Sequence, residues 1–87
     1  MTTREVKIVP TYAPKVGEVF RHYKGDLYKV IGVALNSYNA QEGVDEWIVV
    51  YEPLYEAAAA PLFTRPLLEW SEEVEWKGNT VPRFLTQ

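Results

Sequence analysis

The sequence is short of the residues from which disulfides, thiol chemistry and metal centres are built. It contains no cysteine and a single histidine, His22, among its 87 residues. The absence of cysteine excludes disulfide bonds, a thiol nucleophile and thiolate metal ligands. One histidine without cysteine also excludes a four-ligand structural zinc site. We therefore predict a protein with no metal and no cofactor.

Long apolar runs and glycine-rich loops are missing as well. No apolar stretch approaches the ~20 residues that cross a bilayer, and no apolar signal segment follows the polar N-terminus. The glycines stand apart, at positions 17, 25, 32, 43 and 78, so they cannot form a glycine-rich phosphate loop. We therefore expect a cytoplasmic protein that does not bind membranes.

The sequence is instead rich in apolar and aromatic residues. Hydrophobic residues make up 47% of the chain and aromatic residues 14%, a composition that favours a globular domain over a disordered chain. A domain of this size buries only ~60% of the surface that its unfolded chain exposes. Because each aromatic ring can bury ~150–250 Å², we expect most of the rings to lie in the core.

Charge is distributed unevenly along the chain. Residues 1–29 carry six Lys and Arg against three acids, a balance of +3, whereas residues 30–87 carry three against nine, a balance of −6. The formal net charge of −3 argues against indiscriminate phosphate binding, which needs a basic surface. A local basic strip in the first half stays open as an alternative to an ordinary surface of mixed charge.

Short β-rich segments separated by turn residues follow one another from residue 19 onward. Segments 19–23 and 28–35 are rich in Val, Ile and aromatic residues, and the apolar run 47–51 is typical of a central strand. Further short strands are expected over 62–65, 74–77 and 81–84. Residues 36–45 are a predicted loop, residues 54–60 are predicted to form a loop or a single helical turn, and the segment that begins at Pro66 allows one helical turn.

Two turns are predicted from glycine. Gly25-Asp26 and Gly78-Asn79 each match a two-residue hairpin loop with glycine in the first position, where a positive φ is tolerated. The first of these loops would place Tyr23 opposite Tyr28 and Arg21 opposite Val30. Register matters because it decides which side chains share a face of the sheet.

Together these patterns predict an all-β domain of five or six short antiparallel strands, arranged as a small barrel or sandwich. Residues 1–15 contain two prolines and no clear period, and we assign them to an extended N-terminal arm. Residues 16–87 form the predicted domain.

Several motifs, taken in order, are similar to a known family. They are Arg21-His22-Tyr23-Lys24-Gly25, residues 28–34, Val49-Val50-Tyr51, Leu54-Tyr55, Arg65-Pro66, Gly78 and Pro82-Arg83-Phe84. The sequence from about Val16 to Phe84 resembles the small bacterial family catalogued as domain of unknown function 1653. The resemblance implies an SH3-like small β-barrel and no established activity. The chain departs from the family pattern at Asn36, where members commonly have His, and at Phe63, where Trp is usual.

Arginine and tyrosine side chains are the strongest candidates for a binding site. Arginine offers a planar fork for carboxylate or phosphate groups and stacks on aromatic rings. Tyrosines can form a wall for a peptide or a platform for a base. The predicted ligand-binding residues are Arg21, Tyr23, Tyr51, Tyr55, Arg65 and Arg83. For each arginine the competing interpretation is an ion pair with one of the many acids.

No catalytic residue is predicted. His22 alternates with the apolar Phe20, and no nucleophile elbow or oxyanion loop accompanies it, so we interpret His22 as a structural residue. The main hypothesis is therefore a noncatalytic binding module for a peptide, a protein partner or an anionic small ligand. The alternative is a nucleic-acid-binding barrel that uses the basic first half of the chain. An enzyme that uses His22 and an assembly role for exposed rings are weaker hypotheses.

Overall fold

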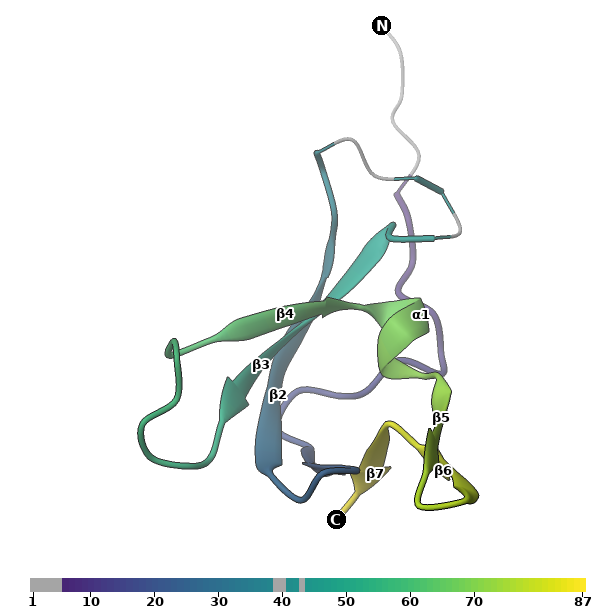
Figure 1. Ribbon diagram of the computed structural model, residues 1–87. Helices are drawn as coiled ribbons and strands as arrows, with labels where there is room; N and C mark the ends of the chain where they lie inside the picture. Colours follow the sequence, from purple (N-terminus) through teal and green to yellow (C-terminus); the bar gives the residue numbers. More distant parts are fainter. Residues whose placement is uncertain (1–5, 39–40, 43) are drawn as a thin grey trace, which may run out of the picture.

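A computed structural model describes residues 6–38, 41–42 and 44–87 of the chain. It contains seven strands and one helical turn in the described part (Figure 1). In chain order these are β1 (Val19–His22), β2 (Leu27–Leu35), β3 (Trp47–Pro53), β4 (Phe63–Pro66), α1 (Leu67–Trp70), β5 (Glu73–Trp76), β6 (Asn79–Pro82) and β7 (Phe84–Thr86). The predicted all-β class is confirmed, with more strands than expected.

The strands form two antiparallel sheets. Five strands pair in the order β4-β3-β2-β1-β7, and β5 pairs with β6 in a separate two-stranded sheet. β4 and β7 are the edges of the larger sheet, and no pairing between them is found in the described residues, so this sheet is open. The predicted small barrel is therefore not closed in the described residues. A four-strand meander accounts for most of the sheet, and only β7 adds to it from the distant C-terminus.

β3 is a central strand, as its apolar run predicts. It pairs with β2 on one side and β4 on the other. Val49 is fully buried and Tyr51 is 4% exposed, because alternate side chains of a strand point to the same face. The buried cluster consists of Ala13, Phe20, Val30, Val49, Tyr51, Leu67, Trp70 and Phe84, with Tyr28, Val33, Trp47 and Phe63 packed against it. Most of these residues are aromatic, as expected for so small a domain.

Both hairpin predictions are wrong in register. The first turn has three residues, Tyr23-Lys24-Gly25: the Gly25 N–H donates to His22 O, and the His22 N–H donates to Asp26 O. Gly25 takes the positive φ at the third position rather than the first. Phe20 therefore pairs with Tyr28, and Arg21 pairs with Leu27. The face that carries Arg21 consequently points away from buried Val30.

The second turn also differs from the prediction, although it keeps two residues. Trp76 pairs with Asn79, which leaves Lys77-Gly78 as the two-residue loop. Both residues have positive φ, 51° and 81°, and this is the type I′ geometry that suits the twist of a hairpin. The prediction placed the loop one residue later because it assigned the left-handed conformation to glycine alone.

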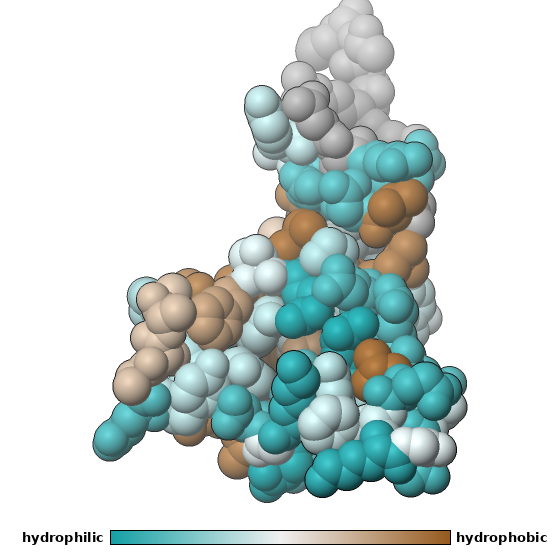
Figure 2. Space-filling view, in the orientation of Figure 1, coloured by the Kyte–Doolittle hydropathy of each residue, from teal (hydrophilic) through white to brown (hydrophobic). Residues whose placement is uncertain are grey.

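The connections agree with prediction more closely. The alanine-rich segment between β3 and β4 forms no helix; Ala57 has φ 61°, which interrupts any helical run. It projects from the body as a mildly hydrophobic tip on the left of the molecule (Figure 2). The predicted helical turn after Pro66 is present as α1, and it buries Leu67 and Trp70.

The N-terminal segment lies against the domain where it is described. The Ala13 N–H donates to Pro10 O at 3.0 Å, and Ala13 is 8% exposed within the core cluster. Lys7 Nζ lies 3.1 Å from Glu46 Oε2. Residues 1–5 of the predicted arm lie outside the described residues. Residues 6–15 are thus irregular in backbone and contact the sheet domain through Lys7 and Ala13, while Val6, Ile8 and Tyr12 are exposed.

Candidate functional site

A cavity of about 300 Å³ opens beside the β1–β2 turn. We call it the arginine cavity. Its lining comes from that turn, from β3 and β4, and from the junction of β6 and β7: His22, Tyr23, Lys24, Asp26, Tyr28, Tyr51, Arg65, Arg83 and Phe84. The Tyr23 N–H donates to Arg83 O at 3.0 Å, and this bond joins the turn to the junction. Segments far apart in the sequence therefore meet at the cavity.

Arg65 is held in place from three sides. Its Nε–H donates to the Tyr51 hydroxyl at 3.4 Å, and Nη1 donates to Glu69 Oε1 at 2.6 Å. The guanidinium carbon lies 5.7 Å from the centre of the Phe84 ring. Its Nη2 has no hydrogen-bond partner in the described part of the chain. The guanidinium is thus preorganised and keeps donors for a further acceptor.

Arg83 approaches the same cavity from the β6–β7 junction. Its Nε–H donates to the Glu69 backbone carbonyl at 3.0 Å, and Nη2 lies 3.8 Å from Glu72 Oε2. The side chains of Arg65 and Arg83 are only 25% and 18% exposed, whereas those of Glu69 and Glu72 are 44% and 58% exposed. Each half-buried arginine therefore has a carboxylate partner that is more exposed to solvent.

The lining of the arginine cavity has an excess of positive charge. Lys24, Arg65 and Arg83 contribute three cationic groups, and Asp26 contributes one carboxylate. Charges in a half-buried site interact more strongly than charges in open water, because the local dielectric constant is lower. Glu69 and Glu72, which pair with Arg65 and Arg83 from outside the lining, offset two of these positive charges, so the cavity chiefly offers an acceptor the guanidinium N–H donors that stay unpaired.

His22 forms one wall of the cavity as a neutral ring. Its Nδ1 accepts a hydrogen bond from the Lys24 N–H at 3.2 Å, which assigns the proton to Nε2. The ring packs on Tyr23 at 4.4 Å and against Phe84 at 5.1 Å between centroids. Burial and the nearby cations, Arg65 first, lower the pKa of His22 below its ordinary value. The imidazole therefore offers an N–H donor at neutral pH.

We expect an NMR titration of the single histidine to show a pKa below 6.5. Protonation is disfavoured in the folded state, so the unfolded state binds the proton first as the pH falls. The contribution of neutral His22 to the free energy of unfolding is therefore fully present above pH 6.5. It is lost as the pH falls, first through the pKa of the unfolded state and then through the lower pKa of the folded state. Arg83→Gln removes one of the cations and should raise the pKa. A midpoint at or above 6.5 in the unchanged protein would contradict this description.

An aromatic cavity adjoins the arginine cavity. It has a volume of about 550 Å³ and shares Tyr28, Tyr51 and Arg65 with the first. Its remaining walls are Tyr55, Leu62, Phe63 and Thr64, and we call it the tyrosine shelf. The Tyr28 and Tyr55 hydroxyls lie 3.2 Å apart, and burial together with this hydrogen bond raises the pKa of Tyr28. The site thus combines a cationic part with an aromatic part.

The structure brings five of the six predicted residues together. Tyr23, Tyr51, Arg65 and Arg83 line the arginine cavity, and Tyr55 lies on the tyrosine shelf. Arg21 is the exception: its Nη1 donates to Gly25 O at 2.7 Å, and it is not among the residues that line either cavity. The corrected hairpin register accounts for this position, because Arg21 points away from the face that carries Tyr28.

Sequence reasoning missed other residues of the lining. His22, Lys24, Asp26, Tyr28 and Phe84 were not among the predicted binding residues, although they line the arginine cavity. A three-residue turn would have placed Phe20 opposite Tyr28, and His22 would then share the cavity face with that ring. The correct turn type is thus the signal that could have indicated His22 and Tyr28, whereas the position of Phe84 depends on the pairing of the distant strand β7 with β1. Among the described residues no group of His, Asp and Glu is arranged to hold a metal ion.

The fold and the adjoining cavities describe a small antiparallel β protein with one mixed cationic and aromatic recess. Residues 18–86 match the family model "Protein of unknown function (DUF1653)", and the chain belongs to this family. The chain is similar to a DUF1653 protein from Bordetella bronchiseptica whose crystal structure is known. The two are 42% identical, with 77% of this chain and 80% of that chain covered and a TM-score of 0.67. A search of curated proteins finds no match. No helix among the described residues has the length and apolar character of a membrane span.

Proposed function

We propose that the chain is a noncatalytic binding module for a ligand with an anionic group and an aromatic or apolar body. The ligand is a peptide or a small molecule. The observation that carries the proposal is the convergence of two half-buried arginines, Arg65 and Arg83, on a cavity that shares three walls with the tyrosine shelf. The anionic group would lie between the guanidinium groups, and the apolar body would lie on the shelf.

The chemistry of the arginines supports this assignment. A guanidinium presents a planar set of donors that matches the oxygens of a carboxylate or a phosphate. Arg65 is already oriented by Tyr51 and Glu69, so less conformational entropy is lost when a ligand binds. The neutral imidazole of His22 adds an N–H donor that carries no charge of its own.

The same lining supports a binding role over a catalytic one. His22 is the only residue with an ordinary pKa near neutrality, and the arginine cavity contains no Ser, Thr or Cys that it could activate. Burial and the nearby cations lower the pKa of His22, so they keep the imidazole neutral and disfavour the imidazolium that a proton acceptor becomes. We therefore assign His22 to ligand contact.

We also propose an SH3-like description of the larger sheet. Support comes from the order of its strands: the meander β1-β2-β3-β4 is followed by the single helical turn α1, and the last strand returns to pair with β1. Small barrels of this class bind extended peptides along grooves lined by aromatic residues. The proposed site lies where the first hairpin meets β3 and β4.

The alternative, nucleic-acid binding by a basic first half, receives less support. Of the cations in residues 6–29, Lys24 lines the arginine cavity, while Lys7 contacts Glu46 and Arg21 contacts Gly25 O. Lys15 and Lys29 line neither the arginine cavity nor the tyrosine shelf, so the proposed site includes one cation of this part of the chain. An affinity for single-stranded DNA that falls steeply as salt increases would favour this alternative.

Phenyl phosphate is a suitable probe, because it joins an anionic group to a ring. We expect calorimetry at neutral pH and low salt to show binding about tenfold tighter than that of inorganic phosphate, a gain of about 1.4 kcal/mol from the ring. Benzyl alcohol, which keeps a ring and lacks the charge, should bind far more weakly. Equal binding of benzyl alcohol and phenyl phosphate would contradict the role of the arginines.

A further inference from the structure

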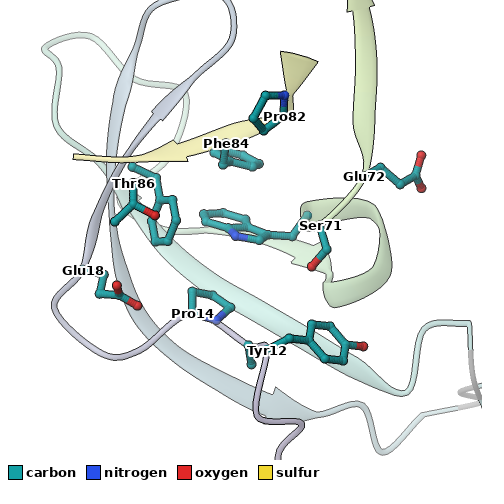
Figure 3. A pocket seen from close by; sticks show the side chains of 11 residues that line it. Tyr12, Pro14, Glu18, Ser71, Glu72, Pro82, Phe84 and Thr86 are labelled. Carbon is teal, nitrogen blue, oxygen red and sulfur yellow. The ribbon is translucent and has the colours of Figure 1, made fainter. Parts of the chain in front are cut away.

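A second cavity lies on the other side of Phe84, away from the arginine cavity. It has a volume of about 300 Å³ and a lining that comes from the N-terminal segment, the end of α1 and strands β6 and β7. We call it the tryptophan cavity. Its lining residues are Tyr12, Ala13, Pro14, Glu18, Phe20, Trp70, Ser71, Glu72, Pro82, Phe84 and Thr86 (Figure 3). Only Phe84 belongs to both cavities.

The indole N–H of Trp70 has no acceptor within the described part of the protein. Trp70 is 5% exposed, and no hydrogen bond of its Nε1 is formed with a described residue. In this part of the chain every fully buried side-chain nitrogen or oxygen has a hydrogen-bond partner. Because the Trp70 Nε1 has none, it is not fully buried and keeps some contact with solvent. A buried tryptophan normally finds a partner for its N–H. Since Trp70 lines the tryptophan cavity, its N–H is available to an acceptor placed there.

The rings around Trp70 decide what kind of group can approach it. Its indole is stacked on Phe84, with centroids 3.7 Å apart and planes at 9°. Phe20 and Tyr51 pack against it at steep angles, with centroid distances of 5.3 and 5.0 Å. One face is therefore covered, and the N–H edge carries positive character. A hydrogen-bond acceptor suits this edge, whereas a cation placed directly on it would be repelled.

The rest of the cavity wall favours a cationic group. Figure 3 shows that the Glu18 carboxylate and the Ser71 hydroxyl turn toward the cavity, while the Glu72 carboxylate turns away from it. No Lys or Arg is among the lining residues. Glu18 Oε1 accepts the Lys15 N–H at 2.6 Å, which leaves the second oxygen for another donor. The cavity thus offers one donor at Trp70 and an anionic acceptor at Glu18.

We propose that the tryptophan cavity binds a basic segment of a partner protein in extended conformation. A backbone carbonyl of the segment accepts the Trp70 Nε1–H, and the adjacent arginine or lysine side chain reaches the Glu18 carboxylate. Tyr12, Pro14 and Pro82 provide the apolar sides against which the rest of the segment packs. The observations that carry this site are independent of the anionic ligand proposed for the arginine cavity.

The test is an NMR titration of the intact protein that follows the indole N–H signals of Trp47, Trp70 and Trp76. The probe is acetyl-Ala-Arg-Ala-amide, and its control is the same peptide with citrulline, which has the shape of arginine without the charge. We expect the arginine peptide to move the Trp70 signal and to bind about tenfold tighter than the citrulline peptide. The other indole signals should stay in place.

A pair of variants separates the carboxylate from general surface charge. Glu18→Gln retains an oxygen for the Lys15 N–H and should weaken binding of the arginine peptide about tenfold. Glu73→Gln, which removes an exposed carboxylate that does not line the cavity, should leave binding unchanged. No movement of the Trp70 signal at millimolar peptide would mean that the cavity holds water only and would overturn the proposal. Equal shifts with both peptides would overturn the role of Glu18.

Discussion

Phe84→Ala should destabilise the protein by about 3–5 kcal/mol, as large-to-small changes in a packed core do. Phe84 is 7% exposed, stacks on Trp70, and lies 5.8 Å from Tyr51 and 5.1 Å from His22 between ring centroids. A domain with a total stability of about 5–15 kcal/mol has little margin for such a loss. Urea denaturation followed by tryptophan fluorescence measures the change.

Leu85→Ala is the matched control for this prediction. Leu85 is the next residue in β7 and is 57% exposed, so its truncation should change stability by less than about 0.5 kcal/mol. Similar denaturation midpoints for the two variants would show that Phe84 does not hold the core together. Because Phe84 is also a wall of both cavities, its loss should disturb both proposed sites.

Arg65→Gln and Arg83→Gln should each weaken phenyl phosphate binding by about ten- to a hundredfold. A hydrogen bond to a charged group contributes about 1.5–3 kcal/mol, and each arginine would supply at least one. The double variant should abolish measurable binding. Calorimetry checks the affinities, and circular dichroism confirms that the fold is kept.

Arg21→Gln provides the control, because Arg21 carries the same charge and lies outside both cavities. Its substitution should leave the affinity within about twofold of the original, a change well under 1.4 kcal/mol. If all three single variants weaken binding equally, the effect comes from net charge and the cavity has no special role. If Arg21→Gln alone weakens binding, the site lies elsewhere.

The strands were predictable because their signals are local. The run Trp47-Ile48-Val49-Val50-Tyr51 indicates a central strand from its own residues, and the structure confirms this position. Register was not predictable in the same way, because it depends on which turn residue adopts a positive φ. Lys77 does so beside Gly78, and Gly25 does so at the end of its turn rather than at the start.

The candidate site likewise has residues that their neighbours in the sequence indicate and an arrangement that only the complete fold determines. Arg65 and Arg83 stand out in the sequence because each lies beside aromatic residues or proline. Their convergence with His22 depends on the Tyr23–Arg83 backbone hydrogen bond, which joins positions that are distant along the chain. The open edge between β4 and β7 also depends on the course of the whole chain. Local sequence patterns therefore indicate candidate side chains, whereas their arrangement depends on the fold of the whole chain.

In the proposed arrangement the arginine cavity and the tryptophan cavity bind groups of opposite charge and lie on the two sides of the Phe84 ring. The arginine cavity has three cationic groups and one carboxylate in its lining, whereas the tryptophan cavity presents the Glu18 carboxylate and has no Lys or Arg in its lining. Phe84 lies between them and packs on Trp70 on one side and near Arg65 on the other. A ligand in either cavity therefore contacts the same core residue.

The most direct measurement of the central proposal is an NMR titration with phenyl phosphate that follows the arginine Nε–H signals. We predict that the signals of Arg65 and Arg83 move together with the ring signals of His22 and Tyr28, while the signal of Arg21 stays in place. Saturating phenyl phosphate that leaves Arg65 and Arg83 unmoved, or that moves Arg21 as much as either, would contradict an anion site in the arginine cavity.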